Sequence, residues 1–144
     1  MFTVAEVMTA EPSVVRESDT LDDVVKLMAE KHIRHVPVTD GDGRLTGLVT
    51  HRDVLAATGA RLRELLDTEK PRQISVAEMM NRRVETVSPL TELRAAARFL
   101  EARKYGCLPV VEGDRLVGII TDTDFVGVAI NLLEQFEMME MGDT

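Results

Sequence analysis

Two short stretches of the sequence combine residue types that could bind a phosphorylated sugar. Residues 47–53 and 118–124 share the pattern Gly-x-x-Thr-x-x-Asp, in which an apolar run ends at the threonine and a helix is expected to begin. A helix N-terminus presents free N–H groups and a positive dipole to an anion, and a neighbouring aspartate can accept hydrogen bonds from a ribose diol. The same residue types also form capping boxes that need no ligand. The pattern by itself is compatible with both interpretations.

The chain contains two copies of one unit. Residues 4–8, Val-Ala-Glu-Val-Met, return as residues 76–80, Val-Ala-Glu-Met-Met, and Pro-Val at 37–38 returns at 109–110. Identities that recur in the same order across the chain indicate an internal duplication. The two Gly-x-x-Thr-x-x-Asp stretches occupy equivalent places in the two copies, so each copy contributes one candidate site.

Each copy predicts the element order β-α-β-β-α, which places the fold in the α/β (α+β) class. Apolar residues at i, i+3, i+4 and i+7 predict amphipathic helices that begin near Leu21 and Leu93, with Asp19 and Thr91 as N-caps. Paired apolar runs around Gly/Asp turns predict one hairpin per copy, formed by residues 36–39 with 45–49 and by residues 108–111 with 116–120. The two units are expected to share one core.

The predicted boundaries follow from the repeat. The first copy covers residues 1–58, a connector with a break at Pro71 covers 59–74, and the second copy covers 75–130. Residues 131–144 form a helical extension and a Met-rich tail. This extension is expected to pack on its own domain or on a second copy of the chain, with docking to a separate partner as the alternative.

The composition excludes several classes of protein. The 144-residue chain has a net charge of −8, which argues against nucleic-acid binding. We expect no membrane span, because no apolar run approaches 18 residues, and no signal peptide, because the N-terminus lacks a basic and apolar leader. The single cysteine, Cys107, excludes a disulfide framework and indicates a cytoplasmic protein. We expect no catalytic residues, since no Ser/His/Asp or Cys/His pattern recurs, and no metal site, since His32 and His35 lack a third ligand.

The duplicated unit resembles a stand-alone tandem cystathionine-β-synthase (CBS) domain pair, also called a Bateman module. The resemblance is carried by residues 4–8 and 76–80, by Arg-His-Val-Pro-Val at 34–38, by Gly-Cys-Leu-Pro-Val at 106–110, and by both Gly-x-x-Thr-x-x-Asp stretches. It implies two units related by a pseudo-two-fold axis, with sheets packed to form a ligand cleft that contains two related pockets. It further implies a non-catalytic regulatory module that binds adenosine nucleotides, AMP first and also ADP or ATP.

The resemblance also assigns roles to individual residues. Asp53 and Asp124 would hold the ribose hydroxyls, and Thr50 and Thr121 would contact ribose or phosphate. Proline cannot donate to a strand ladder, so backbone groups beside the two Pro-Val pairs are expected to stay unpaired and to contact adenine. The residues expected around the adenine are Val15, Val36, Pro37, Val87, Cys107, Leu108 and Pro109.

The two pockets are expected to differ in their affinity for phosphate. Phosphate in a partly desolvated cleft needs compensating cations, and the first copy supplies Arg34, His35 and Arg52. The second copy has Asp122 beside its motif, which would repel phosphate. The two pockets are therefore predicted to differ in their affinity for the nucleotide.

Other functions stay open on the sequence alone. The alternatives are a structural or interaction dimer scaffold that binds no ligand, and a sensor of S-adenosylmethionine or of magnesium-ATP. The nucleotide would be a dissociable ligand, with no covalent cofactor. In the regulatory interpretation the output passes through a conformational or dimer change, within a homodimer, to an effector protein that the sequence does not identify.

Overall fold

The computed structural model describes residues 2–67, 72–103 and 106–142. The predicted break at Pro71 and residues 143–144 of the predicted tail lie outside the described residues. The elements in chain order are η1 (Val4–Glu6), β1 (Thr9–Ala10), α1 (Leu21–Lys31), β2 (His35–Thr39), β3 (Leu45–Thr50), α2 (His51–Asp67), α3 (Val76–Met79), α4 (Leu93–Arg103), β4 (Cys107–Glu112), β5 (Arg115–Thr121) and α5 (Asp122–Gly142).

Short capping boxes open the first helix of each copy. The backbone N–H of Thr3 donates to Glu6 Oε2 at 3.1 Å, and that of Ser75 donates to Glu78 Oε2 at 2.8 Å. These reciprocal bonds satisfy N–H groups that a helix start leaves without an intrahelical partner. The hydrogen bond from Ser75 also lowers the pKa of Glu78.

The predicted N-caps of the two longer helices are wrong by one residue. Thr20, not Asp19, caps α1, because the Asp23 N–H donates to Thr20 Oγ1 at 3.3 Å while Asp23 Oδ2 accepts from the Thr20 N–H at 2.9 Å. Asp19 instead accepts from the Arg16 N–H in the turn before the helix. Likewise α4 begins after Glu92, while Thr91 Oγ1 accepts from the Ser88 N–H. In both copies a turn hydrogen bond occupies the residue that the sequence favours as a cap.

The two predicted hairpins are present, and each forms a small antiparallel sheet. The pair β2–β3 forms one sheet, and β1-β5-β4 forms the other. Each hairpin has a register irregularity at the same repeat position, after Val38 and after Val110. The segments before α1 and α4, predicted as strands, make only isolated parallel bridges, Val15 to Val38 and Val87 to Val110.

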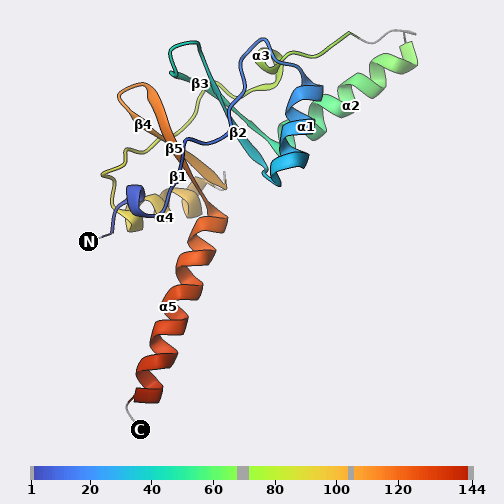
Figure 1. The fold of residues 1–144 in the computed structure, drawn as a ribbon. Helices are drawn as coiled ribbons and strands as arrows, with labels where there is room; N and C mark the ends of the chain where they lie inside the picture. Colours follow the sequence, from blue (N-terminus) through green and yellow to red (C-terminus); the bar gives the residue numbers. More distant parts are fainter. Residues whose placement is uncertain (1, 68–71, 104–105, 143–144) are drawn as a thin grey trace.

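The opening segment of each copy packs on the hairpin of the other copy. In the ladder between β1 and β5, Thr9 pairs with Ile119. In the equivalent bridge Asn81 pairs with Leu48 through two backbone hydrogen bonds of 2.9 Å. Figure 1 shows the N-terminal segment lying beside β5 and α4, far along the chain from it. The two repeats are therefore interlocked rather than merely adjacent.

The expectation of one shared core is wrong. Buried side chains form two main clusters, one around Val36 and Val49 and one around Leu108 and Ile120. A small third cluster is shared by the two copies and combines Leu48 of β3 with Cys107 of β4 and Ile119 of β5. The clusters separate because each hairpin packs against its own long helix, while the exchanged segments contribute buried side chains to the opposite cluster: Val4 to the second, Val76 and Met80 to the first.

Helices α2 and α5 follow the two hairpins directly. α2 continues as one helix through the boundary predicted at residue 58, and the helical patch predicted at residues 61–66 is part of it. α5 contains no buried residue and projects away from the rest of the molecule (Figure 1). In the described part of the chain, no helix combines the length and the apolarity needed to span a membrane.

Candidate functional site

A single large cleft brings the two Gly-x-x-Thr-x-x-Asp stretches together. Its volume is about 1040 Å³, and its walls include Thr50 and Asp53 from the first copy and Thr121 and Asp124 from the second. Each threonine ends a hairpin and each aspartate lies in the first turn of the helix that follows. The cleft therefore lies where the N-termini of α2 and α5 converge, and its volume is at the upper end of the range for small-molecule sites.

Both motifs form closed capping boxes with nearly the same geometry. Asp53 Oδ2 accepts from the N–H of Thr50 at 2.8 Å and from its hydroxyl at 3.0 Å, and the Asp53 N–H donates to Thr50 Oγ1 at 3.3 Å. The equivalent distances for Thr121 and Asp124 are 2.8, 3.2 and 3.4 Å. The capping interpretation is thus confirmed for both motifs. The boxes also hold the two carboxylates in a fixed orientation beside the cleft.

The glycine that begins each motif is required by the exchange of segments. A Cβ atom on Gly47 would lie 2.7 Å from Met80 Sδ and 3.0 Å from the Asn81 carbonyl oxygen. On Gly118 it would lie 2.6 Å from Met8 Sδ and 3.0 Å from the carbonyl oxygen of residue 9. The sulfur atoms end flexible side chains and could move, but the backbone carbonyl oxygens leave a Cβ too little room without a local shift. The glycines therefore let the opening segment of one copy lie against the hairpin of the other, which builds the cleft wall.

The cleft is lined by both basic and acidic side chains. The three predicted phosphate ligands, Arg34, His35 and Arg52, all line it, as do Lys31, His32 and His51. Asp122 also lines the cleft; its backbone N–H donates to the Gly106 carbonyl at 2.9 Å, and its carboxylate lies close to His35, since a Cβ on Gly106 would be 3.5 Å from Asp122 Oδ2 and 3.0 Å from His35 Nε2. At the equivalent place the His51 N–H donates to the Arg34 carbonyl at 2.8 Å. Equivalent backbone positions thus carry a histidine in one repeat and an aspartate in the other.

The structure does not bring the predicted adenine contacts into the cleft. None of these seven described residues is among its lining residues, and all seven side chains are buried in the core: Val15, Val36, Pro37, Val87, Cys107, Leu108 and Pro109.

The expectation that backbone beside the prolines stays unpaired is also wrong. The Pro37 carbonyl accepts from the Val15 N–H, and the Pro109 carbonyl accepts from the Val87 N–H, each at 3.1 Å. The bridging segments before α1 and α4 satisfy these groups from the open edge of each hairpin. An adenine role for these residues stays a prediction.

Cys107 has the properties of a core residue. It is 1% exposed, and burial, with a further contribution from the charge of Asp122, raises the pKa of its thiol to about 12. A thiol with such a pKa is not a nucleophile at neutral pH. Among the described residues, no group of three His, Cys, Asp or Glu side chains could hold a metal ion.

Sequence reasoning missed the wall that the exchanged segments provide. Thr9, Glu11 and Pro12 from the first copy and Asn81 from the second line the cleft. Thr9 and Asn81 come directly after the repeated segments 4–8 and 76–80, and this common position is the signal that could have identified them. An analysis within each copy could not place them beside the hairpin of the other.

Comparison with known proteins gives consistent matches along the chain. A family model described as CBS domain matches residues 4–59 and again residues 76–131. A Vibrio cholerae protein provisionally described as an acetoin utilization protein (AcuB) is 43% identical, with a TM-score of 0.82 over 95% of this chain and 98% of that chain. CBSX2 of Arabidopsis thaliana, solved in complex with AMP, is 32% identical, with a TM-score of 0.78 over 92% of this chain and 98% of that chain.

Curated relatives include longer proteins. The homoserine O-acetyltransferase of Methanococcoides burtonii is 34% identical over 122 residues, which is 84% of this chain. This chain spans about a quarter of the length of that relative, 23%.

Proposed function

Because this chain belongs to the CBS domain family, we propose that it is a non-catalytic regulatory module that binds an adenosine nucleotide in the cleft between its repeats. The observation that carries the proposal is the meeting of both Thr-x-x-Asp boxes in one cleft beside a basic wall. AMP is the first choice, supported by the AMP complex of CBSX2 at 32% identity. ADP and ATP present the same ribose and α-phosphate.

The aspartates of the two capping boxes can still accept hydrogen bonds from a ribose. Oδ2 of Asp53 and of Asp124 is engaged by its threonine, but a carboxylate offers about four lone-pair sites on two oxygens. The remaining sites can accept from the 2′- and 3′-hydroxyl groups. Thr50 and Thr121 then serve mainly to hold the carboxylates at the helix N-termini, with their hydroxyls close to the ribose or phosphate.

The first motif is proposed to bind the nucleotide more tightly. Arg34, His35 and Arg52 line the cleft on its side, and a guanidinium can grip phosphate through two parallel hydrogen bonds. Asp122 also lines the cleft, and its charge opposes a second phosphate. The phosphate of an anionic ligand is therefore expected to lie beside Arg34 and Arg52.

The proposal is tested by calorimetry and thermal unfolding of the full chain with AMP, ADP, magnesium-ATP and S-adenosylmethionine. A ligand at about 100 times its dissociation constant should stabilise the fold by roughly 2.7 kcal/mol. Asp53→Asn and Asp124→Asn keep a side-chain acceptor for the cap but weaken the ribose contact. Asp67→Asn, an exposed change at the end of α2 with the same loss of charge, is the control.

Each outcome of these measurements favours a different hypothesis about the ligand. Loss of the AMP effect in Asp53→Asn but not in the control supports the nucleotide site at the first motif. A response to S-adenosylmethionine or only to magnesium-ATP would change the ligand but keep the cleft. No response to any of the four, in protein that unfolds cooperatively, would favour the ligand-free scaffold, which the self-sufficient capping boxes also permit.

The output of binding is proposed to pass to another protein. We propose that the chain is a cytoplasmic homodimer that signals to an effector protein through a conformational or dimer change. The acetyltransferase relative is about four times as long as the matched segment, and we propose no catalytic activity for this chain.

A further inference from the structure

The cleft contains two half-sites, one beside each Thr-x-x-Asp box, and their residues can be compared position by position. The repeat aligns Arg34 with Gly106, and it aligns His-Arg at 51–52 with Asp-Thr at 122–123. Equivalent backbone hydrogen bonds of 2.8 and 2.9 Å join residue 51 to residue 34 and residue 122 to residue 106, so the alignment also holds in space. The second half-site therefore lacks both arginines of the first at the equivalent backbone positions.

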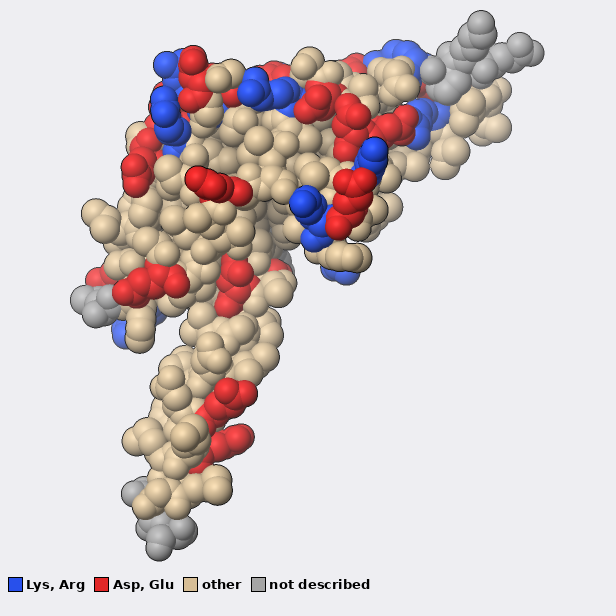
Figure 2. Space-filling view, in the orientation of Figure 1, with Lys and Arg blue, Asp and Glu red and all other residues tan. Residues whose placement is uncertain are grey.

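The second repeat also brings no other described cation to the cleft. All charged residues of α5 are acidic, and in Figure 2 this projecting helix shows red and tan surface. At the end of α4, Arg103 is ion-paired with Glu85 at 3.4 Å, whereas its counterpart Lys31 lines the cleft. Among the described residues, every Lys, Arg and His that lines the cleft comes from the first repeat. The cations therefore favour a phosphate at the first half-site only.

Asp122 and His35 meet across the two repeats at the place where the second half-site lacks an arginine. A Cβ on Gly106 would lie 3.0 Å from His35 Nε2 and 3.5 Å from Asp122 Oδ2, so both atoms lie near one point, and both side chains line the cleft. Gly106 has a φ of +75°, which also favours glycine there. Asp122 Oδ1 accepts from the Thr123 N–H at 2.8 Å, which orients the carboxylate and leaves Oδ2 for another donor.

We propose that the second half-site binds an uncharged adenine nucleoside, whose 5′-hydroxyl is recognised by Asp122 and His35. A carboxylate only accepts hydrogen bonds, while an imidazole nitrogen can donate one. A hydroxyl group donates and accepts, so it can bond to both side chains, whereas a phosphate group meets the carboxylate as a like charge. Asp124 holds the ribose diol. This inference rests on the proposed function, which supplies that ribose contact.

The two ligands are compatible in one cleft. Its volume of about 1040 Å³ is at the upper end of the range for a drug-sized ligand, so a nucleotide and a nucleoside can occupy it together with a single phosphate between them. A site that hydrogen-bonds a hydroxyl discriminates against an analogue that lacks it, because its polar groups are left unpaired. We expect 5′-deoxyadenosine to bind at least about tenfold more weakly than adenosine.

Isothermal titration calorimetry of the full chain tests the second half-site. We expect one AMP per chain, and one adenosine that still binds when the protein is saturated with AMP. Asp122→His with Thr123→Arg installs the residues of the first repeat and should raise the AMP stoichiometry to two while weakening adenosine at least about tenfold. Both positions lie outside the hydrogen bonds of the Thr121–Asp124 box, so thermal unfolding should show an intact fold. Glu137→His with Met138→Arg makes the same change of charge farther along α5 and is the control.

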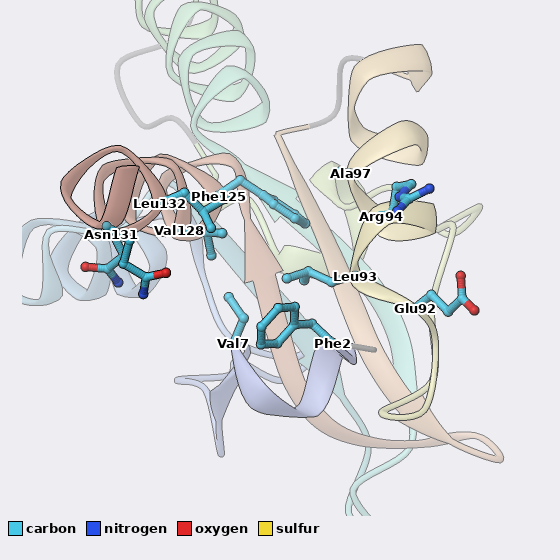
Figure 3. A pocket seen from close by; sticks show the side chains of 11 residues that line it. Phe2, Val7, Glu92, Leu93, Arg94, Ala97, Phe125, Val128, Asn131 and Leu132 are labelled. Carbon is cyan, nitrogen blue, oxygen red and sulfur yellow. The ribbon is translucent and has the colours of Figure 1, made fainter. Parts of the chain in front are cut away.

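An uncharged nucleoside has a second hollow to enter, so a further variant separates the two. An apolar groove of about 480 Å³ lies between the N-terminal segment, α4 and α5. Figure 3 shows apolar side chains on its floor that point toward one another: Phe2, Val7, Leu93, Phe125 and Val128. Leu132 also lines this groove and is 46% exposed. Leu132→Glu places a charge in the groove and should leave adenosine binding unchanged.

The outcomes separate this inference from the proposed function. Two AMP per wild-type chain, no adenosine binding, adenosine that AMP displaces completely, or an AMP stoichiometry unchanged by the exchange at 122–123 would each overturn the inference while keeping a nucleotide site. Adenosine binding lost in Leu132→Glu would place the nucleoside in the groove and overturn it as well. Absence of AMP binding with adenosine binding retained would overturn the proposed nucleotide function instead.

Discussion

Substituting Gly118 by alanine tests whether the two repeats are interlocked as described. The new Cβ would lie 2.6 Å from Met8 Sδ and 3.0 Å from the Thr9 carbonyl oxygen. The methionine sulfur can rotate away, but the carbonyl belongs to the β1–β5 ladder in which Thr9 pairs with Ile119. The backbone of Gly118 has no positive φ, so the expected effect is steric rather than conformational.

The size of the effect follows from two opposing terms. Overpacking of a closely packed site costs about 1–3 kcal/mol, while replacing glycine by alanine recovers about 0.4–1 kcal/mol by restricting the unfolded chain. At the midpoints of these two ranges the net loss is about 1.3 kcal/mol. For a chain of this length the entropy of unfolding is about 0.3 kcal/mol/K, so the midpoint of thermal unfolding should fall by roughly 4 °C.

Differential scanning calorimetry provides the measurement, with Gly127→Ala as the control. Gly127 lies in α5 with no atom near its missing Cβ, so alanine there should leave stability unchanged or raise it by up to about 1 kcal/mol. Adding Met8→Ala should recover part of the loss in Gly118→Ala, a coupling that a double-mutant cycle isolates. A Gly118→Ala protein as stable as the wild type would refute the exchanged packing.

Further predictions concern the core, the caps and acid stability. Cys107, with its pKa raised to about 12 by burial, should resist iodoacetamide at pH 8 in the folded protein and react once urea unfolds the chain; rapid labelling under native conditions would contradict its placement. Thr121→Val should lower the unfolding free energy by about 1 kcal/mol by removing the box with Asp124, whereas Thr121→Ser should not, as urea titrations can show. The Ser75 N–H lowers the pKa of Glu78 below its usual 4.5, so the stabilisation from the Glu78 carboxylate is present above that pH and is lost as the pH falls through the lowered pKa. The difference in unfolding free energy between wild type and Glu78→Gln should therefore be constant above about pH 6 and shrink on acidification below 4.5; a difference that does not change with pH would exclude this cause.

Local patterns predicted the hairpins and helices because the relevant forces are local. The strands around each Gly/Asp turn and the helices after Thr50 and Thr121 follow from alternation, turn residues and capping chemistry within a few positions. The prediction of Asp19 as the N-cap failed because the next residue, Thr20, is an equally good cap. It depends on which of them the preceding turn already uses, and Asp19 is bonded to Arg16.

The cleft could be predicted only in part, because its wall depends on pairing between the copies. Thr50, Asp53, Thr121 and Asp124 are marked by their own motifs, but Thr9 and Asn81 reach the cleft through exchanged segments. The adenine candidates illustrate the same limit. Proline predicts a missing donor, but no local rule reveals that the carbonyl beside it will be satisfied by Val15 or Val87.

The helix α5 connects the proposed nucleotide site to an apolar groove of about 480 Å³ on the second repeat. Its first turn holds the Thr121–Asp124 box and Val126 lines the cleft, while Val128 and Leu132, less than two turns further on, line the groove. A helix transmits a displacement of its first turn along its length, because every turn is hydrogen-bonded to the next. If the nucleotide favours one position of α5, linkage requires that the nucleotide and any molecule that binds the groove change each other's affinity by the same factor. The coupling therefore needs no intervening mobile element, and its size is limited by how differently the nucleotide binds the two positions of this helix.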